Sequence, residues 1–252
     1  QISSSRWPVL FFATVCIGIF SGFGGMSLAL FLHFIQHVAY NHTITPIIQS
    51  HSFLYDVSSA APLTRVIALI LCGCFAGFGW WAVFRYGQPL VSISKAIKTP
   101  KPYMPIGTTL VHVFLQIITV ALGSPLGREV APRELGAVFA CWFTQRLKLH
   151  MKESQILVAC AAGAGLAAVY NVPFGGAMFT LEVLLGSFRW FAVLPAITTS
   201  AIAVIISWIG LGNEVFYQVP KLALTPSVVI WSIVTGPLLG FVAYWFKDAT
   251  DK

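Results

Sequence analysis

One acid and one base stand side by side in an unusually apolar chain: Glu129 follows Gly127 and Arg128. An ionisable group at membrane depth costs about 2.5 kcal/mol or more, so it normally lines a pathway or pairs with a partner. Arg133 comes one helical turn after Glu129, and a local ion pair between these two residues is the alternative to a functional role. The sequence therefore directs attention to the segment that begins at Gly127.

Other titratable side chains lie in apolar stretches. Glu182 is a second such carboxylate, and a core carboxylate paired with a neighbour is one interpretation of it.

His33 and His37 have a spacing that can hold a metal, but no cysteine or carboxylate accompanies them, so we expect polar anchors at the membrane interface. We expect no metal site and no cofactor. The five cysteines are interpreted as small packing residues: Cys16, Cys72, Cys74, Cys141 and Cys160.

The motifs of membrane-embedded enzymes are missing from the sequence. It has no Gly-x-Ser-x-Gly elbow, no His-Glu-x-x-His motif and no pair of intramembrane aspartates, because Asp56, Asp248 and Asp251 fall in predicted loops or the C-terminal tail. An enzyme is therefore not expected. A non-transporting membrane assembly subunit stays open, since glycine-rich helix faces would suffice for it.

Composition predicts an all-α polytopic membrane protein. Hydrophobic residues make up 57% of the chain, charged residues 9%, and the mean hydropathy is +0.82. A helix crosses a bilayer with roughly 20 apolar residues. The apolar stretches predict spans over 9–35, 63–84, 103–122, 128–146, 190–211 and 227–246. A further pair of short helices is expected within 155–185.

The formal net charge of +7 reflects basic residues in short loops, so membrane topology explains it better than a nucleic-acid partner. Most Lys and Arg residues fall on one side if the N-terminus is cytoplasmic and the pair within 155–185 is re-entrant. Arg65 and Lys221 then face outward. The short loops favour a bacterial inner membrane.

Three predicted helix breaks combine glycine with proline. They lie at 87–89, 123–127 and 171–176. Non-helical backbone at membrane depth is tolerated only where it is buried in protein or lines a watery cavity. The N-terminus of a half-helix presents free N–H groups and the positive end of its dipole, which bind anions. The breaks therefore suggest an anion pathway.

The residues at two of these breaks resemble the CLC chloride channels and anion/proton exchangers. The resemblance is carried by Gly-Arg-Glu-Val-Ala-Pro at 127–132 and by Asn-Val-Pro-Phe-Gly-Gly at 171–176, in the family's order and spacing. It implies an inverted-repeat architecture with broken and re-entrant helices in a single transmembrane domain over 1–252. Residues 1–225 correspond to the first repeat and 226–252 to the first helix of the second, with the remainder absent. We expect either a fragment of a longer protein, which is favoured, or a partner chain that completes the pathway.

The resemblance also implies functions for individual residues. Glu129 matches the gating glutamate, which competes with anions and moves aside when protonated or displaced. Backbone groups that face the anion match Gly127, Arg128 and Val130. A nearby Arg133 would favour the charged carboxylate, which predicts opening only at unusually acid pH.

The family's Gly-Ser-Gly-Ile-Pro anion-selectivity turn falls at Gly87, Gln88 and Pro89, with Gln88 in place of the serine. Chloride is the expected anion, and nitrate and fluoride stay open. Glu182 matches the first member of the family's Glu-Glu pair, and Val183 replaces the proton-transfer glutamate of many exchangers.

Valine cannot relay a proton, so chloride conduction is favoured over a proton-coupled exchanger. By analogy with the family, a homodimer is expected, with 179–208 forming half of its interface.

Overall fold

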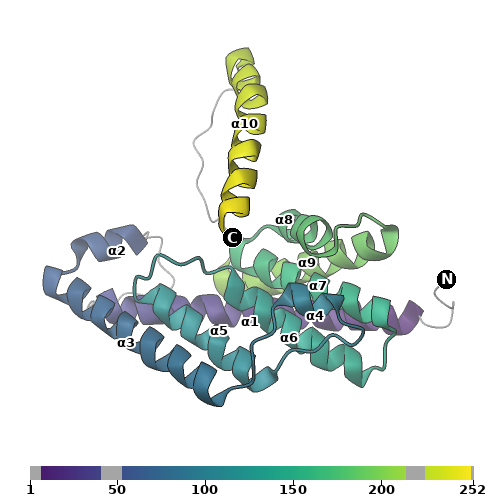
Figure 1. Cartoon of the computed structure of the whole chain (residues 1–252), viewed down its shortest axis with the longest axis horizontal. Helices are drawn as coiled ribbons and strands as arrows, with labels where there is room; N and C mark the ends of the chain where they lie inside the picture. Colours follow the sequence, from purple (N-terminus) through teal and green to yellow (C-terminus); the bar gives the residue numbers. More distant parts are fainter. Residues whose placement is uncertain (1–6, 41–52, 214–224, 251–252) are drawn as a thin grey trace. The chain divides into compact units, whose positions relative to one another are not determined.

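The structure is a computed structural model, and it describes residues 7–40, 53–213 and 225–250, with the main chain alone at 54–56. Every regular element in these residues is a helix (Figure 1). The chain divides into two compact units, 1–214 and 215–252, which are described separately. The first unit contains the helices from α1 to α9, and the second contains α10.

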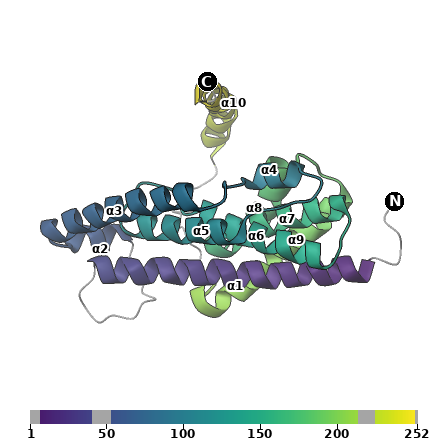
Figure 2. The ribbon, with the colours of Figure 1, turned by 60° about the horizontal axis from the view of Figure 1, so that its bottom comes forward.

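The longest helix lies along one side of the first unit. α1 (Trp7–Tyr40) has 34 residues and runs along the lower side of this unit in Figure 2, with most of the other helices above it. It contacts α9 (Trp190–Leu211) over much of its length. Glycine allows this close approach, because a Cβ atom on Gly22 would lie 2.7 Å from the main-chain oxygen of Ala203.

Four helices precede the Gly-Arg-Glu segment. They are α2 (Phe53–Ser59), α3 (Pro62–Tyr86), α4 (Ile93–Lys98) and α5 (Ile106–Ala121). α3 begins with a proline, which suits the first turn because its missing N–H would have no intrahelical partner there. α4 begins after Ser92, whose hydroxyl accepts a hydrogen bond from a main-chain N–H of the first turn.

The centre of the first unit is the antiparallel pair formed by α6 (Val130–Arg146) and α7 (Met151–Tyr170). α7 is the most buried of the apolar helices long enough to span a membrane. Its alanines and glycines let neighbouring main chains approach. A Cβ atom on Gly165 would overlap the carbonyl oxygen of Pro132 in α6 and lie 2.8 Å from its carbonyl carbon.

The break predicted after the buried glycines is present. Asn171 ends α7 in the left-handed conformation, with φ 55°. Pro173 then starts α8 (Pro173–Met178), which leads directly into a π-helical segment, η2 (Phe179–Leu185). The chain therefore turns sharply here and resumes as a short broken helix.

The second unit contains α10 (Pro226–Thr250), a helix of 25 residues. Pro237 lies inside this helix and removes one main-chain donor from its hydrogen-bond ladder. Its length and composition are sufficient to cross a membrane.

The helical segments were predicted well, although their lengths differ in places. Five helices are long and apolar enough to cross a membrane by length and composition: α1, α3, α7, α9 and α10. α7 was predicted as one of two short helices, yet it has 20 residues. The predicted spans 103–122 and 128–146 are the shorter helices α5 and α6, of 16 and 17 residues. α2 and α4 were not predicted.

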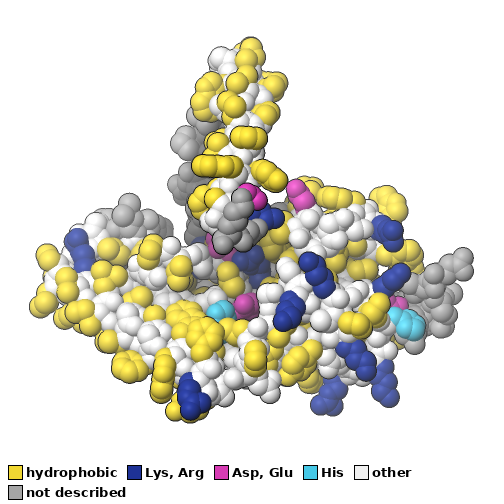
Figure 3. Space-filling model, viewed as in Figure 1, with side chains coloured by type: hydrophobic (Ala, Val, Ile, Leu, Met, Phe, Trp, Pro, Cys, Tyr) yellow, Lys and Arg dark blue, Asp and Glu magenta, His cyan; other side chains and the backbone are white. Residues whose placement is uncertain are grey.

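Basic side chains gather toward the end of the first unit where α1 begins (Figure 3). Two of the helix ends that contribute to this end are α4, with Lys95 and Lys98, and the last turn of α6, with Arg146. The positive-inside rule assigns such a cluster of Lys and Arg residues to the cytoplasmic side of the membrane. A cytoplasmic N-terminus stays a prediction. Lys221 lies outside the described residues.

Candidate functional site

The segment between α5 and α6 is a non-helical turn that leads to Glu129. Gly123 has φ 103°, a conformation that L-residues with side chains rarely adopt. Tyr40, the last residue of α1, fixes the start of the turn by donating a hydrogen bond to the main-chain oxygen of Leu122, over 2.8 Å. The turn thus has a defined shape where it meets the beginning of α6.

Glu129 is the N-cap residue of α6, and Val130 is the first residue of the helix. Within the described residues, the Glu129 side chain does not cap the first-turn N–H groups. It folds back over Gly127 instead. A Cβ atom on Gly127 would lie 2.8 Å from Cδ of Glu129 and would overlap Oε2. Only a residue without a side chain leaves room for the carboxylate in this position.

The carboxylate of Glu129 is held by the end of α7. The Tyr170 hydroxyl donates a hydrogen bond to Oε1 over 3.3 Å. The guanidinium of Arg128 lies over the Tyr170 ring, with its Cζ 5.1 Å from the ring centroid. Arg128, Glu129 and Tyr170 are all partly buried. Three residues from the turn and from α7 therefore meet at the N-terminal end of α6.

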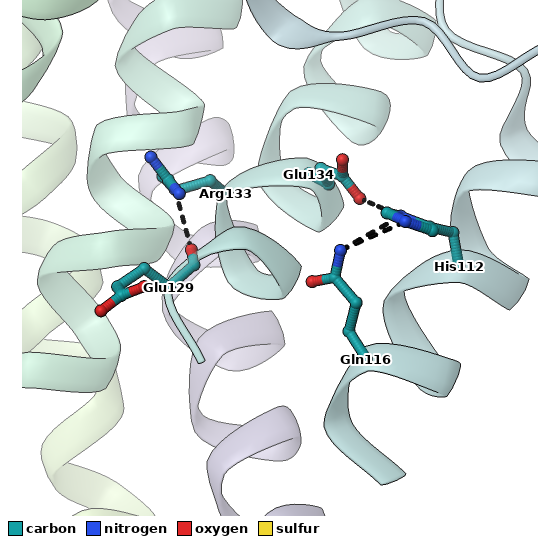
Figure 4. Close-up of polar contacts among 5 residues, drawn as sticks. All are labelled: His112, Gln116, Glu129, Arg133 and Glu134. Atoms are coloured by element: carbon teal, nitrogen blue, oxygen red, sulfur yellow. Dashed lines mark hydrogen bonds and ion pairs between the residues drawn. The ribbon is translucent and has the colours of Figure 1, made fainter. Parts of the chain in front are cut away.

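Arg133 contacts Glu129 differently from the ion pair considered above. Its Nε donates a hydrogen bond to the main-chain oxygen of Glu129 over 2.9 Å, and its guanidinium lies 5.1 Å from the centroid of the Phe179 ring. Figure 4 shows the carboxylate directed away from this contact. The ion-pair alternative is therefore wrong for the described part of the chain, and the expectation of activation only at unusually acid pH loses its basis.

The turn at Gly87, Gln88 and Pro89 is exposed and has its own contacts. The main-chain N–H of Gln88 donates to Oγ1 of Thr108 over 3.0 Å. The Gln88 side-chain oxygen accepts a hydrogen bond from the Tyr103 hydroxyl over 3.1 Å. Both partners come from the segment that starts α5, whereas those of Glu129 come from α6 and α7. Tyr103 thus holds the Gln88 side chain in this turn by a hydrogen bond.

Glu182 and Val183 lie in η2, and both side chains are exposed in the first unit. The interpretation of Glu182 as part of a core pair stays a prediction. The side chains that η2 buries are Thr180 and Leu181.

A second polar cluster was missed by the sequence analysis. Nδ1 of His112 in α5 lies 2.7 Å from Oε2 of Glu134 in α6, and the two side chains are 13% and 14% exposed. Nε2 of Gln116 lies 3.3 Å from the same imidazole (Figure 4). His112 and Gln116 are spaced i, i+4 within the predicted span 103–122, which is the signal that could have identified a polar stripe.

The other titratable candidates have simpler surroundings. Cys72, Cys141 and Cys160 are buried, as packing residues would be, but Cys74 is exposed and Cys16 is intermediate. The described residues contain no group of three side chains suited to hold a metal ion.

Fold and site together define a class: an all-α polytopic membrane protein with broken helices and an acidic side chain at a half-helix N-terminus. The family model described as voltage gated chloride channel matches residues 72–252. The chain therefore belongs to this family, the CLC proteins.

Relatives with similar sequences belong to the same family. The chain is 33% identical over 174 residues to a voltage-gated ClC-type chloride channel ClcB of Yersinia pestis, covering 66% of this chain and 42% of that protein. It is 29% identical over 198 residues to ClcB of Escherichia coli O81 (strain ED1a), covering 76% of this chain and 47% of that protein. The chain thus spans less than half the length of these relatives.

A solved structure confirms the fold. The crystal structure of a slow cyanobacterial Cl−/H+ antiporter matches with a TM-score of 0.73 at 17% identity, over 94% of this chain and 55% of that chain. The all-α CLC architecture predicted from the sequence is therefore confirmed. At this identity the match concerns the fold alone.

Proposed function

We propose that this chain forms part of a chloride pathway in which the Glu129 carboxylate is the gate. The observation that supports this most directly is the position of Glu129: its main chain starts α6, and its carboxylate lies over Gly127 beside Tyr170. The first-turn N–H groups of a helix attract negative charge. The carboxylate lies beside these N–H groups without capping them, and a chloride ion that approaches them would meet its negative charge, so movement of the carboxylate controls entry of the anion.

The residues around Glu129 would take separate parts in this mechanism. The main chain of Gly127, Arg128 and Val130 supplies the N–H environment for the anion. Arg133 holds the main-chain oxygen of Glu129 and leaves its carboxylate able to turn. Protonation removes the negative charge, and with it the competition, so acid conditions favour the open pathway.

Chloride is the proposed anion because the relatives are named as chloride channels and the solved structure as a Cl−/H+ antiporter. Gly87, Gln88 and Pro89 are the second proposed anion-binding turn. Gln88 presents its side-chain amide where the family has a serine, and Tyr103 orients it. This departure keeps nitrate and fluoride as alternative substrates.

We favour passive conduction over proton-coupled exchange. Val183 has no proton to transfer, and it stands where many exchangers have a glutamate. Proton-coupled exchange is the second candidate, because the solved structure with the same fold is named as an antiporter. Residues 1–225 are proposed as the first repeat and α10 as the start of the second. We also propose a homodimer with 179–208 in its interface. The N-terminus is proposed to be cytoplasmic, in a bacterial inner membrane.

The test uses the complete gene product that carries this sequence, reconstituted in liposomes. Chloride efflux and external pH are recorded together for the wild type, Glu129→Ala and Glu129→Gln. We expect wild-type efflux to rise as the pH falls, and both variants to conduct at neutral pH with little further response to acid.

The outcomes separate the alternatives. Efflux without proton movement supports a channel, and stoichiometric proton countertransport establishes an exchanger. If Glu129→Ala keeps the wild-type pH dependence, Glu129 is not the gate. If no anion moves in any preparation, while chloride, nitrate and fluoride are each supplied, a non-transporting assembly subunit becomes the better explanation.

A further inference from the structure

We propose that Tyr170 is a positioning residue that holds the Glu129 carboxylate in its closed position and thereby sets how readily the gate opens. This inference rests on the proposed function of Glu129. Its basis is the hydrogen bond from the Tyr170 hydroxyl to Oε1, over 3.3 Å. In the described part of the chain, the carboxylate has this one side-chain hydrogen bond, so the phenol is the group that decides where the carboxylate rests.

The position of Tyr170 is fixed by its helix. It is the last residue of α7, and Asn171 follows in the left-handed conformation. The side-chain oxygen of Asn171 accepts a hydrogen bond from Nε1 of Trp208 in α9, over 2.9 Å. The Asn171 side-chain nitrogen donates to the main-chain oxygen of Asn213 over 3.1 Å. The end of α7 is thus attached to the end of α9.

The other end of the contact is equally constrained. α6 and α7 approach so closely that Gly165 contacts the carbonyl group of Pro132, in the first turn of α6. Glu129 precedes that turn, and Arg133 holds its main-chain oxygen. Two packed helices therefore set the distance between the phenol and the glutamate main chain, while the glutamate side chain keeps its own rotational freedom. The hydrogen bond from the phenol to the carboxylate therefore affects the position of the glutamate side chain and leaves the two helices in place.

Charge around the contact favours the closed position. Arg128 lies over the Tyr170 ring, so its positive charge is close to the phenol that bonds Glu129. His33 of α1 is within electrostatic reach of Arg128. From α6 itself, Arg133 faces the main chain of Glu129, whereas Glu134 and His112 form a separate pair. Tyr170 and Arg128 are thus the groups directed at the carboxylate end.

Protonation would weaken this attachment. An ionised carboxylate is a stronger acceptor than a neutral carboxyl group, so the phenol favours the charged, closed state. Removing the phenol oxygen should let Glu129 release and protonate more readily. The acid activation of transport should then occur at a higher pH than in the wild type.

The experiment compares the wild type with Tyr170→Phe, which keeps the aromatic ring and its contact with Arg128. Both are prepared with Glu129 intact and on a Glu129→Ala background, and chloride efflux is recorded across pH. Tyr170→Phe should raise efflux at neutral pH roughly fivefold, the effect of losing one hydrogen bond of ordinary strength. It should also move the acid midpoint upward. On the Glu129→Ala background it should leave efflux unchanged at every pH.

Tyr40→Phe is the matched control, because it removes another phenol hydrogen bond from the same turn, at Leu122. Its acid midpoint should equal that of the wild type. Size-exclusion profiles confirm that each variant is folded. The inference is overturned if Tyr170→Phe acts equally with and without Glu129, or if Tyr40→Phe produces the same midpoint shift. A Glu129→Ala protein with wild-type behaviour would instead reject the proposed function, whatever Tyr170→Phe does.

Discussion

Glu129 and Glu134 lie close together in the chain, yet the structure holds them in opposite ways. Glu134 is inside α6 and forms a 2.7 Å contact with His112 of the neighbouring α5. Glu129 precedes the first turn of the same helix, and a longer 3.3 Å hydrogen bond joins it to Tyr170. In Figure 4 the two carboxylates are directed to different sides of α6. Glu134 thus takes part in a close contact between two helices, whereas Glu129 lies at the start of its helix with a longer hydrogen bond.

The comparison shows how a membrane helix can use the same side chain for two purposes. A residue inside the helix has its direction set by the neighbouring turns, so Glu134 must face α5. A residue at the N-cap has fewer neighbours on its N-terminal side, and Gly127 leaves that space open for Glu129. Position relative to the helix start, more than residue type, therefore distinguishes the surroundings of Glu134 from those of the proposed gate, Glu129.

The largest expected effect is the loss of stability in Glu134→Ala. Breaking a buried pair by removing one partner costs about 3–5 kcal/mol. His112 and Glu134 are 13% and 14% exposed, so we expect roughly 2–3 kcal/mol here. Glu129→Ala should cost less than about 1 kcal/mol, because its hydrogen bond is long and partly exposed. Unfolding of the purified protein in detergent, followed by circular dichroism, measures both changes.

Replacing both members of the pair provides the control. The double variant His112→Leu and Glu134→Leu removes both members of the pair and leaves only the partly buried Gln116 without its His112 contact, so it should recover part of the stability lost in Glu134→Ala. Glu134 would not be the more important carboxylate for stability if Glu129→Ala destabilised the protein as much as Glu134→Ala does.

A smaller loss is expected where glycine sets the distance between α6 and α7. Gly165→Ala would place a methyl group against the main chain of Pro132, which cannot turn away as a side chain can. We expect a cost of about 1–3 kcal/mol. Because the helices would separate, Tyr170 should also lose its hold on Glu129, and chloride efflux at neutral pH should rise along with the loss of stability.

Gly24→Ala is the matched control for this change. The nearest atom that its methyl group would meet is Cδ2 of Leu135, 2.9 Å away, at the flexible end of a side chain. The leucine can rotate, so stability should stay within about 1 kcal/mol of the wild type. Equal losses from the two substitutions would show that helix approach at Gly165 has no special importance for the gate.

Much of this fold follows from local rules that the sequence displays. The apolar stretches predicted most helices to within a few residues, because spanning length and hydropathy are properties of each segment. The break at 171–176 was predicted from its proline and glycines. α4 was missed although Ser92 is a favourable N-cap residue, since its helix is too short for a periodic pattern.

The site depends on packing between segments, which local patterns do not contain. Arg133 is placed to reach either the carboxylate or the main-chain oxygen of Glu129. The ring of Phe179, from η2, lies under its guanidinium when it takes the second position. Tyr170 contacts Glu129 only because Gly165 lets α7 approach α6. Chemistry at Glu129 was predicted, but its partners required the structure.

The last and smallest effect is that of Gly127→Ala. This substitution tests whether the carboxylate of Glu129 needs the space that a side chain at Gly127 would fill. Gly127 does not have a positive φ in the described structure, so alanine should be accepted by the main chain. Its methyl group would overlap the Glu129 carboxylate, which is the flexible end of a side chain and can move. We therefore expect a stability change below about 0.5 kcal/mol. Chloride efflux at neutral pH should rise roughly twofold to threefold, because the carboxylate is displaced at a cost of less than about 1 kcal/mol.

The background with Glu129→Ala makes this prediction specific. Once the carboxylate has been removed, the methyl group at Gly127 has nothing to displace, and efflux should match that of Glu129→Ala alone. A rise that persists without the carboxylate would mean that the substitution acts through the main chain of the turn. The backbone conformation of the turn around Gly127 would then control efflux. The difference between Glu129 and Glu134 would in that case come from the main chain, and the space above Gly127 would not explain it.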